Sequence, residues 1–231
     1  MPHRQPVGPL FGRYIGTAMS IQGRQFTITN ILSEQADRHV NEYWIVFEAT
    51  SLDGPAPVIV KARFELPNAG IAPEWAARVR REAERCFRDE ADSLEACLDL
   101  GPQAFPTYMA KDLLVQGGND PLPGGYIRVI VMSKVPGRSV VDQLRSLTPA
   151  DRATIRTQLA RTLEQIRLKG FTFSEEETEQ IFYDARNRAM YLTGFSRIGR
   201  ELGPPRDEYR ITEDSVNVTA FGMGWASNVG H

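Results

Sequence analysis

Hydrophobic and polar positions alternate along the first third of the chain in the manner of β-strands. The run QFTITNIL (25–32) alternates, EYWIVFEAT (42–50) is rich in aromatic and β-branched residues, and APVIVKARFEL (56–66) follows a Ser-Leu-Asp-Gly-Pro turn. Successive side chains of a strand point to opposite faces, so these runs are typical of strands with one buried face. We therefore expect three antiparallel strands in this part of the chain.

The spacing of apolar residues then lengthens to that of a helix. Pro73 begins a segment that runs to residue 98 and stops before Gly101-Pro102, with arginine and glutamate dense on one side. Glu90 falls on the apolar stripe of this helix, where a hydrophobic side chain is expected. The rest of the stripe comprises Trp75, Val79, Ala83, Cys86 or Phe87, Leu94, and Cys97 or Leu98.

A further strand and a second helix follow. YIRVIVMSKVPGRS (126–139) indicates a strand that ends at Pro136-Gly137, where the composition changes. Thr148-Pro-Ala-Asp151 is typical of a capped helix N-terminus with proline at the first helical position. Apolar residues at helical spacing continue to Gly170, a natural stop; they are Ile155, Leu159, Leu163 and Ile166.

The last part of the chain has weaker patterns. EQIFYD (179–184) and RAMYLTGF (188–195) predict two short strands joined as a hairpin, and an irregular tail follows. The whole order of elements predicts an α+β fold. We expect an N-terminal extension over 1–24, a sheet-rich lobe over 25–136 that includes the helix 73–98, and a helix-led lobe with the tail over 137–231.

Composition and charge narrow the function classes. The 231 residues carry a formal charge of −2, which gives no global field for nucleic acid, and no apolar run suits a membrane span or a signal peptide. We therefore expect a cytoplasmic protein without nucleic-acid or membrane partners. Cys86 and Cys97 are expected to be reduced thiols, and His3, His39 and His231 lack converging partners, so no metal site is predicted.

Lys61 is unusual because it lies inside an apolar strand. Alternation places it with Ile59 and Arg63 on one face of the strand, opposite a run of apolar side chains. Burying an unpaired ammonium group is costly, so Lys61 needs a partner, and Glu90 on the following helix is the obvious candidate. The alternative from the pattern alone is that both side chains reach solvent past the edge of the sheet.

The order of these elements resembles the protein kinase fold, and in particular the small kinase-like proteins common in fungi. VIVK (58–61) and Glu90 match the lysine that anchors phosphates in that family and its glutamate partner on the next helix. YIRVIVM places Met132 at the gatekeeper or early hinge position. The resemblance covers roughly residues 25–200, and it implies two lobes, an antiparallel-sheet N-lobe and a shortened helical C-lobe.

The catalytic positions that the resemblance implies are altered. Gln180 falls at the metal-binding asparagine, Phe173-Ser174-Glu175 at the catalytic-loop triplet, and Gly194-Phe195-Ser196 at the Asp-Phe-Ser motif. Glu175 keeps a carboxylate and is a weak candidate for a proton acceptor, Gln180 keeps a neutral oxygen, and Gly194 offers no ligand. The segment LSEQADRHVNEY (32–43), expected as the loop over the phosphates, has no glycine.

These departures favour a pseudokinase, a catalytically degraded kinase-like protein that binds a protein or a small molecule. The cleft residues would be Lys61, Glu90, Met132, Gln180 and Gly194. No cofactor is expected, and the lost carboxylate weighs against binding of ATP and Mg²⁺. A shortened lobe would leave apolar helix faces uncovered, which favours a protein partner or a homodimer.

Two alternatives stay open on the sequence alone. In the first alternative, the cleft catalyses non-phosphoryl chemistry on a small molecule, such as a cyclisation or isomerisation in a biosynthetic pathway. Glu175, Lys61 or Tyr191 would act as acid or base. Aromatic residues would shape its apolar pocket; they are Phe171, Phe173, Phe182 and Tyr183. In the second alternative, the protein is a weak phosphotransferase that uses Glu175 and holds its metal in another way.

Overall fold

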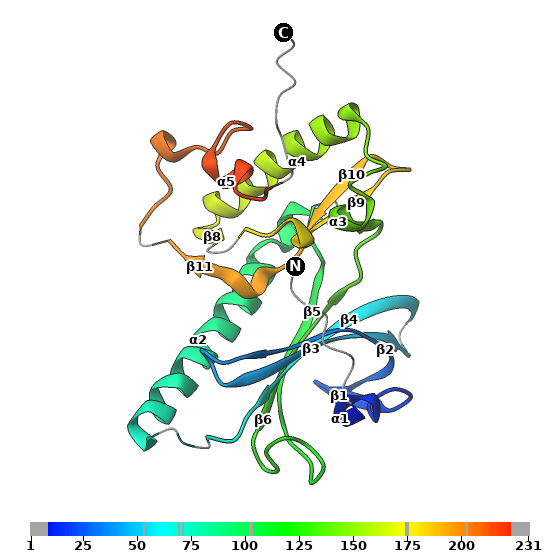
Figure 1. Ribbon diagram of the computed structural model, residues 1–231, viewed down its shortest axis with the longest axis vertical. Coiled ribbons are helices and arrows are strands. Elements are labelled where there is room, and N and C mark those ends of the chain that lie inside the picture. The colour runs from blue at the N-terminus through cyan, green and yellow to red at the C-terminus, as the bar shows by residue number, and fades with distance from the viewer. Residues whose placement is uncertain are drawn as a thin grey trace. The chain divides into compact units, whose positions relative to one another are not determined.

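The computed structural model describes residues 9–52, 54–68, 70, 72–101, 104–173, 176–201 and 203–222 as a mixture of helices and antiparallel strands (Figure 1). The chain divides into two compact units. The first comprises the residues up to Ala91 together with Tyr108–Lys134, and the second comprises Asp92–Thr107 together with the residues from Val135 onward. The predicted change of composition at Pro136-Gly137 lies within a few residues of one of these boundaries.

An antiparallel sheet forms the first unit. Its order is β1-β2-β3-β4-β6-β5, with β1 at Ala18–Ile21, β2 at Arg24–Asp37, β3 at Glu42–Ser51, β4 at Gly54–Glu65, β6 at Tyr126–Ser133 and β5 at Tyr108–Val115 (Figure 1). The predicted strands are confirmed as β2, β3, β4 and β6. Strands β1 and β5 were not predicted from the sequence.

The expectation of a long loop over 32–43 is wrong. Strand β2 continues through residue 37, and its last residues pair in register with the start of β3, from Ser33 opposite Val46 to Asp37 opposite Glu42. Only Arg38–Asn41 forms the turn, and Asn41 supplies a positive φ of 50°. Backbone pairing therefore outweighs the polar composition of this segment.

The apolar face of the sheet is covered by the start of the chain. The core of this face contains four buried residues of β4, namely Val58, Val60, Ala62 and Phe64. It also contains Phe11 of helix α1 (Pro9–Gly12), and the ring centroid of Phe11 lies 4.9 Å from that of Phe64. The sheet unit therefore begins before residue 25. Residues that lie within the segment predicted as an extension contribute both this core contact and strand β1.

The turn between β1 and β2 reaches the far edge of the same sheet. The backbone N–H of Gln22 donates to Asp112 Oδ2 at 2.7 Å, and its side-chain amide donates to the carbonyl of Lys111 at 2.8 Å. Asp112 and Lys111 belong to β5, which is an edge strand of the sheet in the described part of the chain. Gln22 therefore satisfies part of an otherwise open sheet edge.

The predicted long helix is confirmed as α2 (Pro73–Ala96). Ala83, Glu90 and Leu94 on its stripe are buried, but Trp75 is 55% exposed. Trp75 lies on the first turn, where its indole packs under the guanidinium of Arg78 at 5.4 Å instead of entering the core. Leu98 is also exposed, because the helix ends at Ala96 and the helical period no longer applies.

The second unit contains the second predicted helix, α4 (Pro149–Leu168). Thr148 and Asp151 form a capping box at its N-terminus, and Gly170 follows its end with a φ of +81°. The predicted hairpin is confirmed as β9 (Ile181–Asp184) and β10 (Ala189–Leu192), with β7 (Arg138–Ser139) beside β9. Further short elements are α3 at Val140–Gln143, β8 at Phe171–Phe173, β11 at Ile198–Arg200 and α5 at Val216–Thr219, with 3₁₀ helices at Leu98–Leu100, Thr178–Gln180, Phe195–Arg197 and Asp207–Tyr209.

The C-terminal segment 206–222 packs along α4. The backbone N–H of Ile211 donates to Glu164 at 2.9 Å, and Arg156 donates to the carbonyl of Glu213 at 2.9 Å. Val218 and Phe221 are fully buried. The predicted apolar stripe of α4 is buried, so the expectation of an uncovered helix face is wrong for this helix; the stripe residues are Ile155, Leu159, Leu163 and Ile166.

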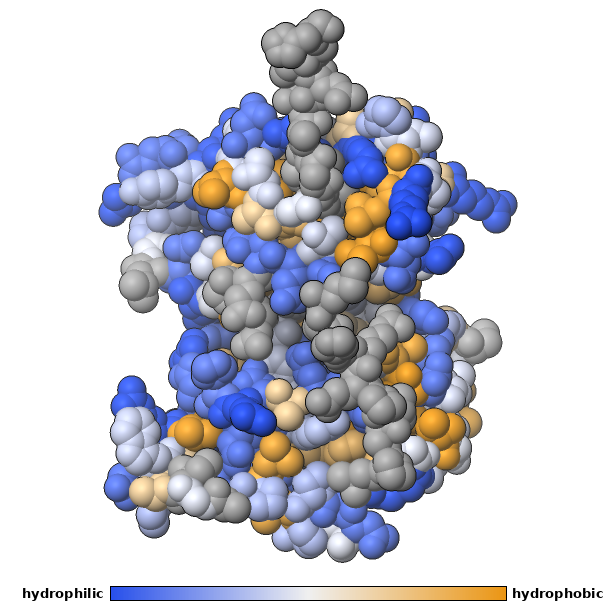
Figure 2. Space-filling model, in the orientation of Figure 1, coloured by the Kyte–Doolittle hydropathy of each residue, from blue (hydrophilic) through white to orange (hydrophobic). Residues whose placement is uncertain are grey.

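Some apolar side chains of the described residues are exposed. On the face shown in Figure 2, hydrophobic residues form small separate patches among hydrophilic ones. Individual exposed residues such as Leu113 and Val115 on the edge strand are ordinary features of a protein surface. No helix within the described part of the chain is long and apolar enough to cross a membrane.

Candidate functional site

Lys61 and Glu90 form an ion pair in the first unit. Lys61 Nζ lies 2.5 Å from Glu90 Oε1, and the side chains are 12% and 1% exposed. Cross-strand register places Lys61 between Val46 on β3 and Ile130 on β6, so the ammonium leaves an apolar row of the sheet toward helix α2. The predicted pairing is confirmed, and the alternative that both side chains reach solvent is wrong, because Glu90 is buried.

Arg63 contributes a second cation to the same carboxylate. Its Nη2 donates to Glu90 Oε2, and its guanidinium carbon lies 4.4 Å from the ring centroid of Trp44. Arg63 is also directly opposite Arg128 in the β4–β6 register, an arrangement of like charges that is destabilising by itself. Glu42 offsets this repulsion, because its carboxylate accepts a hydrogen bond from Arg128 at 2.7 Å and lies 3.9 Å from the guanidinium of Arg63.

These ion pairs make a continuous network of alternating charge. Three cations, Lys61, Arg63 and Arg128, share two buried carboxylates, Glu90 and Glu42. Burial alone would raise the pKa of Glu90, but the neighbouring ammonium and guanidinium groups hold it below its ordinary value. Glu90 is therefore ionised at neutral pH. For Glu42, burial is the largest influence and raises the pKa, despite Arg63, Trp44 and Arg128.

Met132 lies near the end of the same sheet. It is 8% exposed on β6 and is paired in register with Ile59 of β4 and Tyr108 of β5. The first unit ends two residues later, at Lys134. Met132 therefore shares strand β6 with Arg128 of the network, but it is not one of the charged residues of the network.

Gln180 and Gly194 lie against each other in the second unit. Gly194 has a φ of +83°, and a Cβ at this position would be 2.5 Å from Gln180 Cγ and 2.6 Å from Gln180 Cδ. Gln180 is 7% exposed, and its backbone carbonyl accepts a hydrogen bond from the backbone N–H of Thr193 at 2.8 Å. The glycine is required both by its left-handed backbone and by the close approach of the glutamine side chain.

An aromatic cluster supports this turn. Phe195 follows Gly194 in a short 3₁₀ helix (Phe195–Arg197), and its ring is 5.7 Å from the rings of both Phe105 and Phe173. Phe221 of the C-terminal segment lies 6.3 Å from Phe173. The cluster fixes the segment after Gly194 by apolar packing between rings.

The second unit thus lacks charge at the positions where the sequence resemblance places metal ligands. Gln180 is neutral and Gly194 has no side chain, while Glu175 lies outside the described residues. In the described ranges, no three or more histidine, cysteine, aspartate or glutamate side chains gather as a metal site. The five predicted cleft residues form two groups, Lys61, Glu90 and Met132 in the first unit and Gln180 with Gly194 in the second.

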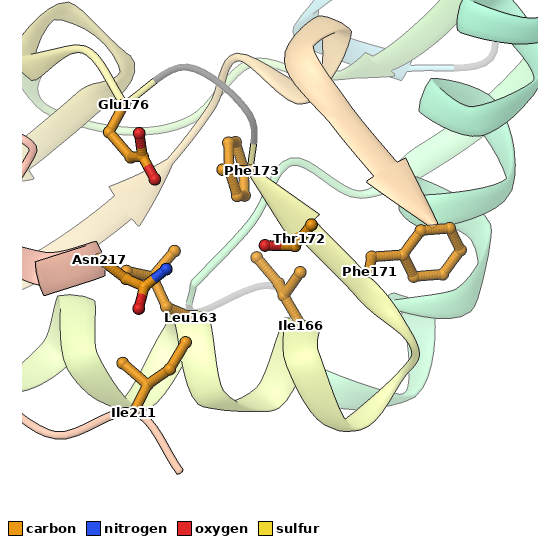
Figure 3. A pocket seen from close by; sticks show the side chains of 8 residues that line it. All are labelled: Leu163, Ile166, Phe171, Thr172, Phe173, Glu176, Ile211 and Asn217. Atoms are coloured by element: carbon orange, nitrogen blue, oxygen red, sulfur yellow. The ribbon is translucent and has the colours of Figure 1, made fainter. Parts of the chain in front are cut away.

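A small pocket lies between α4, β8 and the C-terminal segment (Figure 3). Figure 3 shows the carboxylate of Glu176 and the hydroxyl of Thr172 near it, with an apolar wall of Leu163, Ile166 and Ile211. Its volume of about 10 Å³ accommodates about one water molecule. Although Phe171 and Phe173 line this pocket, it is too small for an organic substrate.

A second pocket, of about 260 Å³, lies on the first unit. It is lined by Arg13, Tyr14, Thr17 and the loop 117–120. Asp120 accepts hydrogen bonds there from Arg13, from the Tyr14 hydroxyl at 2.6 Å and from the backbone N–H of Gly117 at 2.7 Å. These contacts tie the start of the chain to the β5–β6 loop. Neither pocket includes Lys61 or Gly194.

The sequence contained signals for the rest of the network that were not used. Glu42 begins and Arg128 interrupts a strand rich in aromatic and branched residues, and Arg63 follows Lys61 on the same face. A charge inside an apolar strand requires a partner of opposite sign, whichever strand carries it. Applying that rule to every strand, and not only to the strand of Lys61, would have found all three residues.

Comparison with known proteins gives likenesses of fold only. No protein-family model matches the chain, and no curated protein matches its sequence. Among solved structures it is similar to the kinase PK-1 of Cydia pomonella granulovirus, with a TM-score of 0.48 and 12% identity, over 74% of this chain and 52% of that one. It is also similar to WbdD, with a TM-score of 0.49 and 20% identity, over 79% of this chain and 35% of that one.

The chain therefore covers about half of the first of these structures and about a third of the second. At such scores and identities, neither likeness bears on the activity of this chain.

Proposed function

We propose that this chain is a catalytically degraded kinase-like protein, a pseudokinase, that acts by binding and not by phosphoryl transfer. The observation that carries the proposal is the packing of Gln180 against Gly194. The resemblance places metal ligands at positions 180 and 194, and both positions hold uncharged residues. Lys61 and Glu90, which the resemblance assigns to ligand binding, are kept as an ion pair in the first unit.

The chemistry of magnesium supports this proposal. Mg²⁺ prefers hard anionic oxygens in octahedral geometry, and in kinases it neutralises the charge that develops on the phosphates. Glycine provides no oxygen ligand from a side chain, and an aspartate at position 194 would place its Cβ against the buried side chain of Gln180. Regaining the carboxylate would thus require Gln180 to move as well.

The ligand in this proposal is a protein partner, a second copy of the chain or a small molecule, and the protein acts in the cytoplasm. ATP and Mg²⁺ are not part of the proposal, and neither are nucleic acids or membranes. The non-phosphoryl alternative would need an apolar pocket of roughly 300 Å³ or more. The pocket beside Phe171 and Phe173 has about 10 Å³ and is too small to be the site of such chemistry, so we place that alternative second.

A thermal-shift titration tests the proposal. The full chain is heated with ATP alone, with Mg²⁺ alone and with both, since a ligand that binds only the folded state raises the midpoint. We expect the midpoint with ATP and Mg²⁺ together to be no higher than with ATP alone. Tight Mg²⁺-dependent ATP binding, followed by phosphoryl transfer to any acceptor, would overturn the proposal.

The variant Lys61→Met is the matched control for any nucleotide effect. If ATP without metal raises the midpoint of the wild-type chain, the shift should disappear in Lys61→Met, because the ammonium is the cation assigned to the ligand. A shift that persists in this variant would place the nucleotide elsewhere and remove Lys61 from the proposed site.

A further inference from the structure

Two cations hold Glu90, and they differ in how firmly they are themselves held. Lys61 occupies Oε1 and Arg63 occupies Oε2, so each carboxylate oxygen has its own partner. The Lys61 side chain retains 12% exposure, whereas that of Arg63 has 1%. A lysine ammonium is a compact charge on a flexible stem, and it exchanges partners more readily than a planar guanidinium in a fixed stack.

Arg63 is fixed from several sides. Its guanidinium stacks on Trp44 of β3 at 4.4 Å and lies 5.9 Å from the ring of Phe87 on helix α2. Its Nη1 is 3.9 Å from the buried carboxylate of Glu42. If Arg63 left Glu90 it would remain a buried cation, which is costly unless a new partner is found. The arginine therefore connects sheet and helix through charge and aromatic packing together.

We propose that Arg63 is the residue that holds helix α2 on the sheet, and that Lys61 is the exchangeable partner of Glu90. Helix α2 then stays in place when Lys61 turns toward an anionic group such as a phosphate or carboxylate. The role of Arg63 stands on the geometry of the first unit, whereas the availability of Lys61 to a ligand rests on the proposed function.

Solvent access within the network agrees with this division of roles. Among the three cations that hold Glu42 and Glu90, the side chain of Lys61 is 12% exposed, that of Arg128 is 6% exposed and that of Arg63 is 1% exposed. Lys61 is therefore the cation that an external anionic group reaches most readily.

Amide hydrogen exchange over α2 tests the proposal without any ligand. The full chain is compared with Lys61→Met, Arg63→Met and the control Arg88→Met, whose arginine is 62% exposed and pairs with Glu84 on the same helix. We expect Arg63→Met to reduce protection of residues 83–94 by about a hundredfold or more. Lys61→Met and Arg88→Met should change it by about threefold or less.

A double-mutant cycle distinguishes positioning through Glu90 from a general loss of packing. In a Glu90→Gln background, Arg63→Met should cost much less protection in α2 than it does in the wild-type chain. Equal losses in both backgrounds would overturn the proposal, as would a Lys61→Met variant that exposes α2 as much as Arg63→Met does.

If Arg63→Met does not fold, Arg63→Lys takes its place. This variant keeps the charge but loses the planar guanidinium that stacks on Trp44. We expect protection to fall in α2 while amides of β2 and β3 keep theirs. Wild-type protection of α2 in Arg63→Lys would overturn the proposal. A failure to detect any ligand would affect only the proposed function, since the exchange experiment contains none.

Discussion

The network around Glu90 and the turn at Gly194 solve opposite physical problems. In the first unit, charges are buried among aromatic and apolar side chains and are stabilised by one another. In the second unit, neutral groups are held by shape, with the buried side chain of Gln180 filling the space beside a glycine. One site depends on charge and the other on packing.

This difference shows how the two groups of side chains are stabilised. A buried ion pair is strongly destabilising to break on one side, so Arg63 and Glu90 constrain one another whether or not a ligand binds. Gly194 has no side chain and therefore has no charged partner to satisfy. The charges of the first unit therefore stabilise one another, whereas position 194 is restricted by its left-handed backbone and by the side chain of Gln180.

The largest expected effect comes from removing the shared carboxylate. Glu90→Ala leaves Lys61 and Arg63 without it, and we expect a loss of about 3–5 kcal/mol in the free energy of unfolding. Urea unfolding followed by circular dichroism measures it. Glu84→Ala is the control, because Glu84 is 55% exposed in its pair with Arg88 and should cost about 0.5 kcal/mol. Similar losses in both variants would show that charge does not maintain the first site.

A side chain at the second site should act through sterics. Gly194→Ala introduces a Cβ within 2.6 Å of two Gln180 atoms, whereas Gly170→Ala shares the left-handed φ but meets nothing within 4 Å. We expect Gly170→Ala to cost about 1–2 kcal/mol from the backbone alone. Gly194→Ala should cost about 1–3 kcal/mol more than this control, measured by the same unfolding curves.

The source of that extra cost can be identified with Gln180→Ala. This substitution removes the atoms that the new Cβ would meet, so the double variant should be more stable than the sum of the two single losses indicates. Strict additivity would mean that Gln180 does not restrict position 194, and the comparison between a charged site and a packed site would lose its second half.

The sequence predicts one of these sites much better than the other. Lys61 and Glu90 each break an apolar pattern, one in a strand and one on a helix stripe, and a buried charge demands a partner. Their pairing therefore follows from periodicity. Gly194 breaks no pattern, because glycine is ordinary after a strand, and its contact with Gln180 depends on a tertiary approach that no local rule describes.

The missed strands have a similar explanation. Strand β5 carries Lys111 and Asp112 side by side, so its alternation is broken, and as an edge strand it has fewer apolar neighbours to satisfy. Strand β1 has four residues and includes a serine, too little for periodicity to indicate. By contrast, β4 and α4 were predicted closely because each has a long apolar pattern with clear ends.

The smallest expected effect is a difference in acid sensitivity between the two sites. Although burial opposes it, Lys61 and Arg63 hold the pKa of Glu90 below its ordinary value of 4.5. The folded state therefore binds fewer protons than the unfolded state as the pH falls below that value. The stabilisation by Glu90 is complete above pH 4.5 and is lost as the pH falls through the folded pKa.

The pKa of Glu42 is shifted in the opposite direction, so the informative quantity is the difference in the free energy of unfolding between the wild-type chain and Glu90→Gln. Below pH 4.5 the free energy of unfolding of the wild-type chain should fall more steeply than that of Glu90→Gln, by at most about 1.4 kcal/mol per pH unit, while Gln180→Ala should keep the wild-type slope because it removes no charge. Parallel curves for the wild-type chain and Glu90→Gln would mean that Glu90 gains no stabilisation from its two cations, and the charged site would then differ from the packed one only in composition.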